Sequence, residues 1–255
     1  MNSLPEGYKA LVIGASGAIG GALLDTLRAD PRCGGVTGVS RSGVIGVSRS
    51  GVSEISRGSA PAPAPAPALD LENEASIAAA AATLRTVAPF HLIVCATGVL
   101  QVGGRPPEKR LADLDPATLA RLFAINTIGP ALVIKHFHEL LPTRERCLLA
   151  VLSARVGSIG DNRKGGWYGY RASKAALNML LKTAAIEVAR KRPLAVLAAL
   201  HPGTVRSALS TPIIGSAEAA TPVDAAGHLL AVLDELPAEG ASGGFHAWDG
   251  AAIAW

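Results

Sequence analysis

The chain has 255 residues, 49% of them hydrophobic and 17% charged, with a formal net charge of +4. This length and apolar content suit one α/β domain with a buried sheet and exclude extensive disorder. Lysine and arginine are scattered, with no run longer than residues 190–192, and only 4% of residues are aromatic. A nucleic-acid partner is therefore not expected, whereas small anionic ligands suit the mild positive charge.

The three cysteines, Cys33, Cys95 and Cys147, are widely spaced and odd in number. This spacing predicts neither a disulfide framework nor a metal site. The first residues lack the basic-then-apolar pattern of a signal peptide, and no apolar run reaches the roughly 18 residues of a membrane helix. We therefore expect a cytoplasmic protein with no membrane span and no bound metal.

The N-terminal region predicts a strand, a glycine-rich turn and a helix. An apolar run at residues 8–13 is followed by three spaced glycines and then by leucines at helical spacing. Glycines at such a turn let the backbone approach a pyrophosphate held at the helix N-terminus. The alternative is a tight turn without a ligand. We expect the turn to bind a dinucleotide through Gly14, Ser16, Gly17, Ile19 and Gly20.

A second strand, predicted at residues 35–39, leads to Arg41 between two serines. At this point of a dinucleotide-binding fold the chain meets the adenosine ribose. An acid there suits the 2′-hydroxyl, whereas an arginine suits a 2′-phosphate. The residues therefore favour NADP(H) over NAD(H).

The same region contains an eight-residue tandem repeat, residues 38–45 and 46–53. Two copies of so short a unit make no solenoid, and we interpret them as a duplication that lengthens a loop. Either Arg41 or Arg49 could therefore meet the phosphate. Alternating alanine and proline follow, so an exposed low-complexity loop is expected over about residues 42–68.

Beyond this loop, strands and helices alternate to the end of the chain. Strands are predicted at residues 69–71, 90–95, 147–152, 195–200 and 244–248, and helices at residues 72–88, 116–140, 168–190 and 222–236. Continuous apolar strands are typical of a parallel sheet buried on both faces. The alternation predicts a single-domain α/β Rossmann fold over residues 1–255, with a doubly wound parallel sheet of about seven strands flanked by helices.

Several polar or small residues follow these strands or lie in the adjoining helices. Asp70 could face an adenine or cap the next helix. Ala96, Thr97 and Gly98 end a central strand, where a glycine lets a cofactor pass close to the backbone. Asn126 lies within a predicted helix, although asparagine is a mediocre helix former, so it is a candidate for a specific role or an ordinary exposed residue.

Tyr170 and Lys174 are four residues apart in a predicted helix, so their side chains share one face. An ammonium near a phenol favours the phenolate, which would lower the pKa of Tyr170 and make it an acid/base. The alternative is a chance spacing in which the lysine extends into solvent. The other motifs of the chain favour the catalytic interpretation.

In their order along the chain, these motifs resemble those of the short-chain dehydrogenase/reductase family over essentially the whole length. The residues that carry the resemblance are the glycine turn, Asp70, Ala96–Thr97–Gly98, Asn126, Tyr170 with Lys174, and Pro202–Gly203. The chain is most similar to small single-domain carbonyl reductases of the C-factor and sniffer type. This similarity rests on residues 157–159, the segment Tyr-Arg-Ala-Ser-Lys at residues 170–174 and the C-terminal Trp255.

The resemblance implies NADPH-dependent hydride transfer between the cofactor and a carbonyl or alcohol substrate. Tyr170 would exchange a proton with the substrate oxygen, and Lys174 would hold the nicotinamide ribose. Asn126 would anchor a water that links Lys174 to solvent. The family also implies a homodimer or homotetramer built on the two long helices. The residues implied to lie beside the nicotinamide are Pro202, Gly203 and Val205.

The sequence departs from the family pattern most clearly at Ala154. A serine usually stands there and donates a hydrogen bond to the substrate oxygen. Ser153 is the first candidate for this role and Ser158 the second. The departure also motivates an alternative, a dinucleotide-binding regulatory or signalling protein with little turnover.

Two further departures lie in the cofactor contacts. Ala18 stands where the middle glycine of the turn is usual, and Arg206–Ser207 stands where an acid or threonine is more usual. The glycine spacing also occurs in sugar-nucleotide epimerases and dehydratases, but the short C-terminal region leaves little room for a sugar-nucleotide domain.

Overall fold

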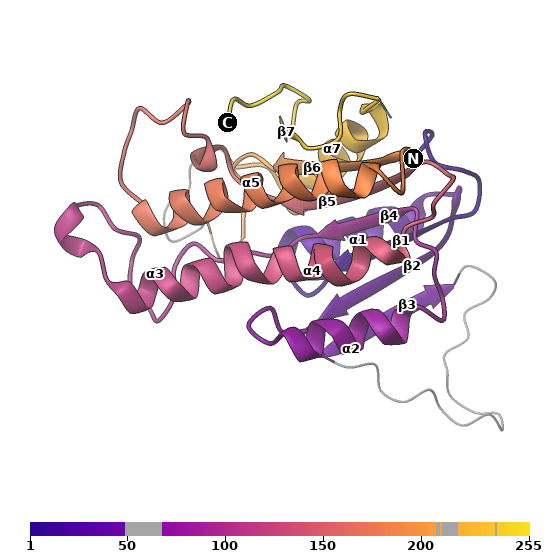
Figure 1. Ribbon diagram of the computed structural model, residues 1–255, viewed down its shortest axis with the longest axis horizontal. Helices are drawn as coiled ribbons and strands as arrows, with labels where there is room; N and C mark the ends of the chain where they lie inside the picture. The colour runs from indigo at the N-terminus through magenta and orange to yellow at the C-terminus, as the bar shows by residue number, and fades with distance from the viewer. Residues whose placement is uncertain (49–67, 208–209, 211–218, 238) are drawn as a thin grey trace.

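Six parallel strands and one antiparallel edge strand form the central sheet of the computed structural model, which describes residues 1–48, 68–207, 210, 219–237 and 239–255. The order across the sheet is β3-β2-β1-β4-β5-β6-β7 (Figure 1). The strands are β1 (Tyr8–Ile13), β2 (Cys33–Ser40), β3 (Gly43–Ser48), β4 (Leu92–Cys95), β5 (Cys147–Leu152), β6 (Ala195–His201) and β7 (Gly244–Ala247). The order reverses between β1 and β4, where such sheets bind ligands. The predicted Rossmann fold is thus confirmed.

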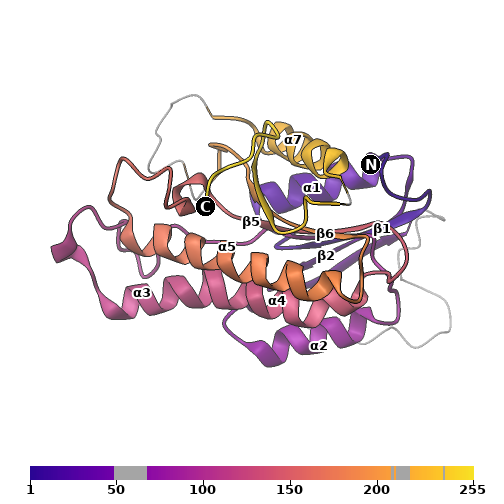
Figure 2. The ribbon, with the colours of Figure 1, turned by 45° about the horizontal axis from the view of Figure 1, so that its top comes forward.

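Helices cover both faces of the sheet (Figure 2). One face carries α1 (Ala18–Ala29) and α7 (Pro222–Glu235), which pack against each other. The other face carries α2 (Glu74–Leu84), α4 (Gly129–Phe137) and α5 (Tyr168–Ala189). Every residue of β4 and β5 is buried, which explains their continuous apolar sequences.

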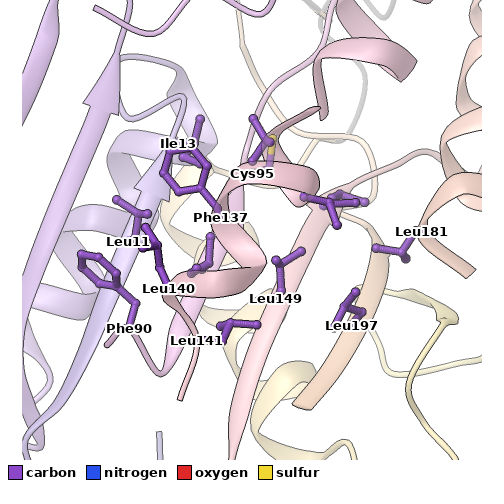
Figure 3. Close-up of a cluster of buried hydrophobic side chains, with 14 of the residues drawn as sticks. Leu11, Ile13, Phe90, Cys95, Phe137, Leu140, Leu141, Leu149, Leu181 and Leu197 are labelled. Atoms are coloured by element: carbon purple, nitrogen blue, oxygen red, sulfur yellow. The ribbon is translucent and has the colours of Figure 1, made fainter. Parts of the chain in front are cut away.

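The core has one layer on each side of the sheet. Figure 3 shows the layer beneath α4 and α5, where Phe137 of α4, Leu181 of α5 and Leu149 of β5 belong to one buried cluster. Alternate strand residues point to opposite layers: Val151 lies in the layer beneath α4 and α5, and Leu152 in the layer beneath α1 and α7. This alternation fixes which side chains can reach α5 at the ends of the strands.

The third strand is not where the sequence predicted it. Residues 69–71 form no strand; the Leu69 N–H donates to the Ser40 carbonyl at the end of β2. Instead, the chain turns at Arg41 and Ser42, and β3 runs back antiparallel to β2. The prediction of a loop over residues 42–68 is therefore wrong for residues 43–48.

The tandem repeat explains this edge strand. The repeated unit carries the glycine and valine residues of β2, so it can pair with the strand that precedes it, with Val39 opposite Val44. Gly43 completes the turn at a φ of +116°, a conformation that L side chains rarely adopt. Arg49, the alternative to Arg41, lies outside the described residues.

The predicted helix at residues 116–140 is continuous but irregular. It consists of α3 (Pro116–Phe123), a π-turn (Ala124–Ile128), α4 and a 3-10 turn (His138–Leu140). Its length, and a mean hydropathy of 1.5 in an 18-residue window of it, would allow it to cross a membrane, but core helices meet the same two criteria. Here it packs beside α2 and α5 on the sheet (Figure 1). The π-turn contains Asn126, and such turns often mark functional sites.

Candidate active site

The glycine turn after β1 is shaped by close backbone contacts. A Cβ at Gly20 would lie 2.1 Å from the Gly14 carbonyl oxygen, and a Cβ at Gly14 would lie 2.7 Å from the Ala96 carbonyl oxygen. Gly14 also has a φ of +88°. Glycine is therefore required at both positions for the turn to close against α1 and β4. The departure at Ala18 is compatible with this geometry, because that residue is exposed.

A first pocket of about 220 Å³ opens over the ends of β1, β2 and β4. Arg41 stands exposed at the tip of the β2–β3 turn, on its rim, and Asp70 is exposed on the same rim. The N-cap of α2 is Asn73, so Asp70 is not the helix cap. Eight of the predicted cofactor residues line this pocket: Gly14, Ser16, Gly17, Arg41, Asp70, Ala96, Thr97 and Gly98.

A second pocket, also of about 220 Å³, lies at the ends of β5 and β6. Tyr170 reaches it from the first turn of α5, and Ser153 and Ala154 reach it from the end of β5. Besides Tyr170, four predicted cofactor residues lie here rather than in the first pocket: Ile19, Pro202, Gly203 and Val205. Gly20 is buried beneath the turn and lines neither pocket.

Lys174 lies between the two pockets. Its Nζ is 6.0 Å from the centre of the Tyr170 ring and donates to the Leu152 carbonyl at 2.8 Å. A Cβ at Gly98, in the first pocket, would lie 3.0 Å from the same Nζ. The alternative in which this lysine extends into solvent is wrong, since its side chain is 2% exposed.

Burial shifts the titration of both groups. The pKa of Tyr170 is raised to about 12, because burial disfavours the phenolate. The pKa of Lys174 is lowered to about 8 by burial, and the Cys95 thiol partly opposes that shift. The expected lowering of the Tyr170 pKa is therefore wrong for the protein alone. At neutral pH Tyr170 is a protonated phenol, which suits a proton donor.

Asn126 is fully buried and holds the backbone that follows β4. Its Oδ1 accepts the Val99 N–H at 2.8 Å, and its Nδ2 donates to the Val99 carbonyl at 2.8 Å and to Ser173 Oγ at 3.2 Å. Its Oδ1 would also lie 3.4 Å from a Cβ at Gly98, close to Lys174 Nζ. The alternative of an ordinary exposed residue is wrong.

The two candidate serines lie in different surroundings. Ser153 lines the second pocket, but its hydroxyl donates to Asn178 Oδ1 of α5 at 2.7 Å. Ser158 lines a separate hollow, and its hydroxyl oxygen accepts the Asp161 N–H at 3.1 Å. Of the two serines, only Ser153 therefore lines the same pocket as Tyr170, and its hydroxyl proton is donated to Asn178.

Sequence analysis missed two residues that shape the start of α5. Trp167 precedes the helix with a φ of 52°, unusual for a bulky side chain, and its ring meets that of Tyr170 edge-on at 6.3 Å. Its N–H donates to the Glu108 carbonyl, and the buried Glu108 carboxylate accepts the Gly169 N–H. Sequence periodicity does not reveal these contacts, because they join segments that are about 60 residues apart in the chain.

The chain is similar in sequence to known proteins. The family model described as short chain dehydrogenase matches residues 8–216. A 1-hydroxy-2-glutathionyl-2-methyl-3-butene dehydrogenase from Rhodococcus sp. (strain AD45) is 35% identical over 157 residues, 62% of this chain and 67% of its own. The C-signal protein of Myxococcus xanthus is 36% identical over 149 residues, 57% of this chain and 83% of its own.

Solved structures share the fold at lower identity. The NADPH-bound carbonyl reductase from chicken fatty liver matches with a TM-score of 0.77 at 24% identity, over 99% of this chain and 100% of its own. The carbonyl reductase Sniffer of Drosophila melanogaster matches with a TM-score of 0.76 at 20% identity, over 98% of this chain and 99% of its own. At these identities the two structures support the fold.

Proposed function

The chain belongs to the short-chain dehydrogenase family, and from this premise we propose that it is an NADP(H)-dependent oxidoreductase that interconverts a carbonyl compound and its alcohol. The observation that carries the proposal is the position of Lys174. It lies beside Gly98 of the first pocket and 6.0 Å from the Tyr170 ring of the second. A dinucleotide in the first pocket would thus end next to an acid/base in the second.

The residues of the first pocket fit a dinucleotide. Its floor is the glycine turn, where added Cβ atoms would clash with backbone, and this turn leads into the N-terminus of α1. Backbone N–H groups at a helix N-terminus favour a pyrophosphate. Arg41 supports a preference for the 2′-phosphate of NADP(H) over NAD(H), since it is exposed on the same rim and its guanidinium suits bidentate binding.

When bound, the cofactor supplies a hydride to the carbonyl carbon. Tyr170 donates its phenolic proton to the carbonyl oxygen, so the products are an alcohol and the oxidised cofactor. The phenolate left on Tyr170 lies near the ammonium of Lys174, which stabilises it until a proton returns from solvent. Asn126 holds the backbone beside that lysine and would anchor the water for proton return.

The second pocket supports a largely apolar carbonyl substrate. Its lining includes the side chains of Ile19, Leu100, Val156 and Trp167 together with Tyr170. In a mostly apolar pocket the polar groups orient the ligand, and the burial of apolar surface contributes to its affinity. The name of the Rhodococcus relative describes oxidation of an alcohol, which is the reverse direction of the same chemistry.

A dinucleotide-binding signalling protein is the second candidate. Two observations favour it: Ala154 lacks the usual hydroxyl, and one of the relatives is a protein named C-signal. This function predicts that NADPH binds without being consumed. It shares the first pocket with the proposed oxidoreductase and differs only in turnover.

Two further properties belong to the proposal. Exposed apolar side chains along α5 and the π-turn, Met179, Ile186 and Ile128, support a homodimer or homotetramer. In the described part of the chain none of the three cysteines forms a disulfide and all three are buried, which fits a reducing cytoplasm.

The test is NADPH consumption with a panel of aldehydes and ketones, using the unmodified protein, Tyr170→Phe and Tyr168→Phe. Tyr170→Phe should lower kcat by about 10²- to 10⁴-fold, because it removes a general acid. Tyr168→Phe is the matched control, since Tyr168 lines a separate hollow. Binding of NADPH to all three proteins with no consumption by any would favour the signalling function instead.

A further inference from the structure

Because Ala154 has no hydroxyl, the usual donor of a hydrogen bond to the substrate oxygen is missing. Ala154 and Ser153 both line the second pocket, but the Ser153 hydroxyl donates to Asn178 in a buried pair. Ser158 lines a different hollow. Neither serine offers its O–H to the space beside Tyr170.

We propose that His201 takes this role, its Nε2–H donating a hydrogen bond to the substrate oxygen that receives the Tyr170 proton. This assignment rests on the oxidoreductase function proposed above and names a residue that completes its site.

The sheet brings His201 to the required side. It is the last residue of β6, and Leu200 before it pairs with Leu152 of β5. Leu152 and Leu200 both point into the core layer beneath α1 and α7, so the residues that follow them point toward α5. Ser153 does so, as its bond to Asn178 of α5 demonstrates. His201 therefore stands beside Ser153 on the face that carries Tyr170, and it lines the same pocket.

The two ring nitrogens of His201 differ in their surroundings. Nδ1 is buried without a hydrogen-bond partner in the described part of the chain. The ring is only partly buried, and no bond to Nε2 is present among the described residues, so Nε2 is the nitrogen open to the pocket. A proton on Nδ1 would be a buried donor without an acceptor, whereas a proton on Nε2 can reach a ligand. This favours the tautomer that donates from Nε2.

The ring is held neutral. Burial lowers the pKa of His201 to about 4, and the nearby guanidinium of Arg155 adds to this, while Asp249 opposes it. A neutral imidazole can polarise a carbonyl by donating a hydrogen bond without giving up its proton. His201 thus supports the proton transfer from Tyr170 and does not compete with it.

The other hydroxyl groups and the guanidinium group of this pocket are engaged elsewhere or exposed. The Ser210 hydroxyl donates to the Val205 carbonyl and contacts the Ser207 hydroxyl. The Arg155 guanidinium pairs with Asp161 at 3.5 Å. Thr204 is exposed. Besides Tyr170, His201 and the Trp167 indole are the half-buried donors of this pocket that make no such bond within the described residues, and of these two only His201 stands beside Ser153 at the end of the sheet.

The experiment compares kcat, KM and NADPH affinity for the unmodified protein, His201→Ala and His201→Gln. His201→Ala should lower kcat by about 10²-fold, as loss of one donor to a developing oxyanion does. NADPH affinity, measured by fluorescence titration, should change less than the rate. His201→Gln places an amide N–H near the position of Nε2–H and should recover part of the lost rate.

Two further variants separate this role from a structural one. Ala154→Ser restores the usual hydroxyl, so the loss caused by His201→Ala should be smaller in the Ala154→Ser background. His246→Ala, on the neighbouring strand β7 and outside this pocket, should leave kcat unchanged. The kcat profile of the unmodified protein should show no histidine titration near pH 6.5.

Each outcome has one interpretation. An unchanged kcat in His201→Ala overturns the assignment while leaving the oxidoreductase function intact. A loss that neither His201→Gln nor Ala154→Ser relieves, accompanied by weaker NADPH binding, assigns His201 a structural role and also overturns it. No NADPH consumption by the unmodified protein would instead refute the proposed function itself.

Discussion

The carboxylate of Glu108 accepts the backbone N–H of Gly169 at 3.2 Å, although 61 positions separate the two residues. Gly169 lies in the first turn of α5, and Trp167, at the N-cap, makes no side-chain cap bond. A carboxylate from a distant loop therefore satisfies an N–H that a capping residue normally binds, and its charge suits the helix N-terminus. The turn that it holds contains Tyr170.

We predict that Glu108→Ala destabilises the protein by about 0.5–2 kcal/mol, the usual cost of a lost N-cap, and lowers kcat because Tyr170 loses its fixed position. Glu108→Gln keeps an acceptor and should lose less of both. Urea unfolding and steady-state kinetics measure the two effects. Lys109→Ala, next in sequence and exposed, is the control. Equal kinetics for Glu108→Ala and the unmodified protein would show that this contact does not position Tyr170.

Gly20→Ala should abolish or strongly weaken NADPH binding, because the new Cβ would lie 2.1 Å from the Gly14 carbonyl oxygen and displace the turn. Gly21→Ala is a matched control, since its Cβ would lie 3.4 Å from the Ala15 carbonyl oxygen, an ordinary contact. Fluorescence titration with NADPH compares the two, and thermal unfolding checks that both variants fold. Similar affinities for both variants would mean that the turn does not hold the cofactor.

The parallel core of the fold could be predicted from sequence because burial and periodicity signal it directly. The predicted strands at residues 8–13 and 147–152 coincide with β1 and β5. The third strand could not be predicted in the same way. Whether Gly43–Ser48 extends a loop or pairs with β2 depends on the turn at Arg41, and the same residues allow both.

The site could be predicted only where a motif marks it. Tyr170 and Lys174 were identified by their spacing, and Asn126 by its place in a predicted helix and by the family resemblance. The structure brings Lys174 and Asn126 together beside Gly98, with Lys174 Nζ 6.0 Å from the Tyr170 ring. His201 was not identified, because a histidine at a strand end has no distinguishing pattern. Its position beside Ser153 follows from the register of β5 and β6, which exists only in the folded sheet.

Arg41→Ala should raise the Kd for NADPH by at least about tenfold and leave the Kd for NADH nearly unchanged. The physical reason is that only NADPH carries the 2′-phosphate, and one charge-assisted hydrogen bond is worth about 1.5–3 kcal/mol. Titration of both cofactors against both proteins measures the difference. Equal affinities of the unmodified protein for NADPH and NADH would refute the role of this arginine.

Ile186→Glu should convert an oligomer into monomers. Ile186 is 56% exposed on α5, and a charge buried in an apolar interface is costly to desolvate. Val223→Glu is the control, since Val223 is similarly exposed but lies on α7, on the opposite face of the sheet. Light scattering of the three proteins gives their masses. A monomeric unmodified protein at micromolar concentration would contradict the proposed assembly.

Burial of Lys174 should make the stability of the protein depend on pH. The pKa of Lys174 is about 8 in the folded protein, lowered by burial from 10.5. Between these values the unfolded chain binds one more proton at this residue, so its contribution to the free energy of unfolding rises with pH. Below pH 8 the buried ammonium imposes its full cost.

Lys174→Met removes this titration and keeps a long apolar side chain. The free energy of unfolding of the unmodified protein, minus that of Lys174→Met, should therefore increase between pH 8 and pH 10.5, by up to about 3 kcal/mol. The lost bond from Nζ to the Leu152 carbonyl adds an offset that varies little with pH, and the titration of groups that do not interact with Lys174 cancels in the difference. Urea unfolding on both sides of pH 8 gives the two curves. Parallel curves would mean that Lys174 titrates normally and that its burial does not alter its charge.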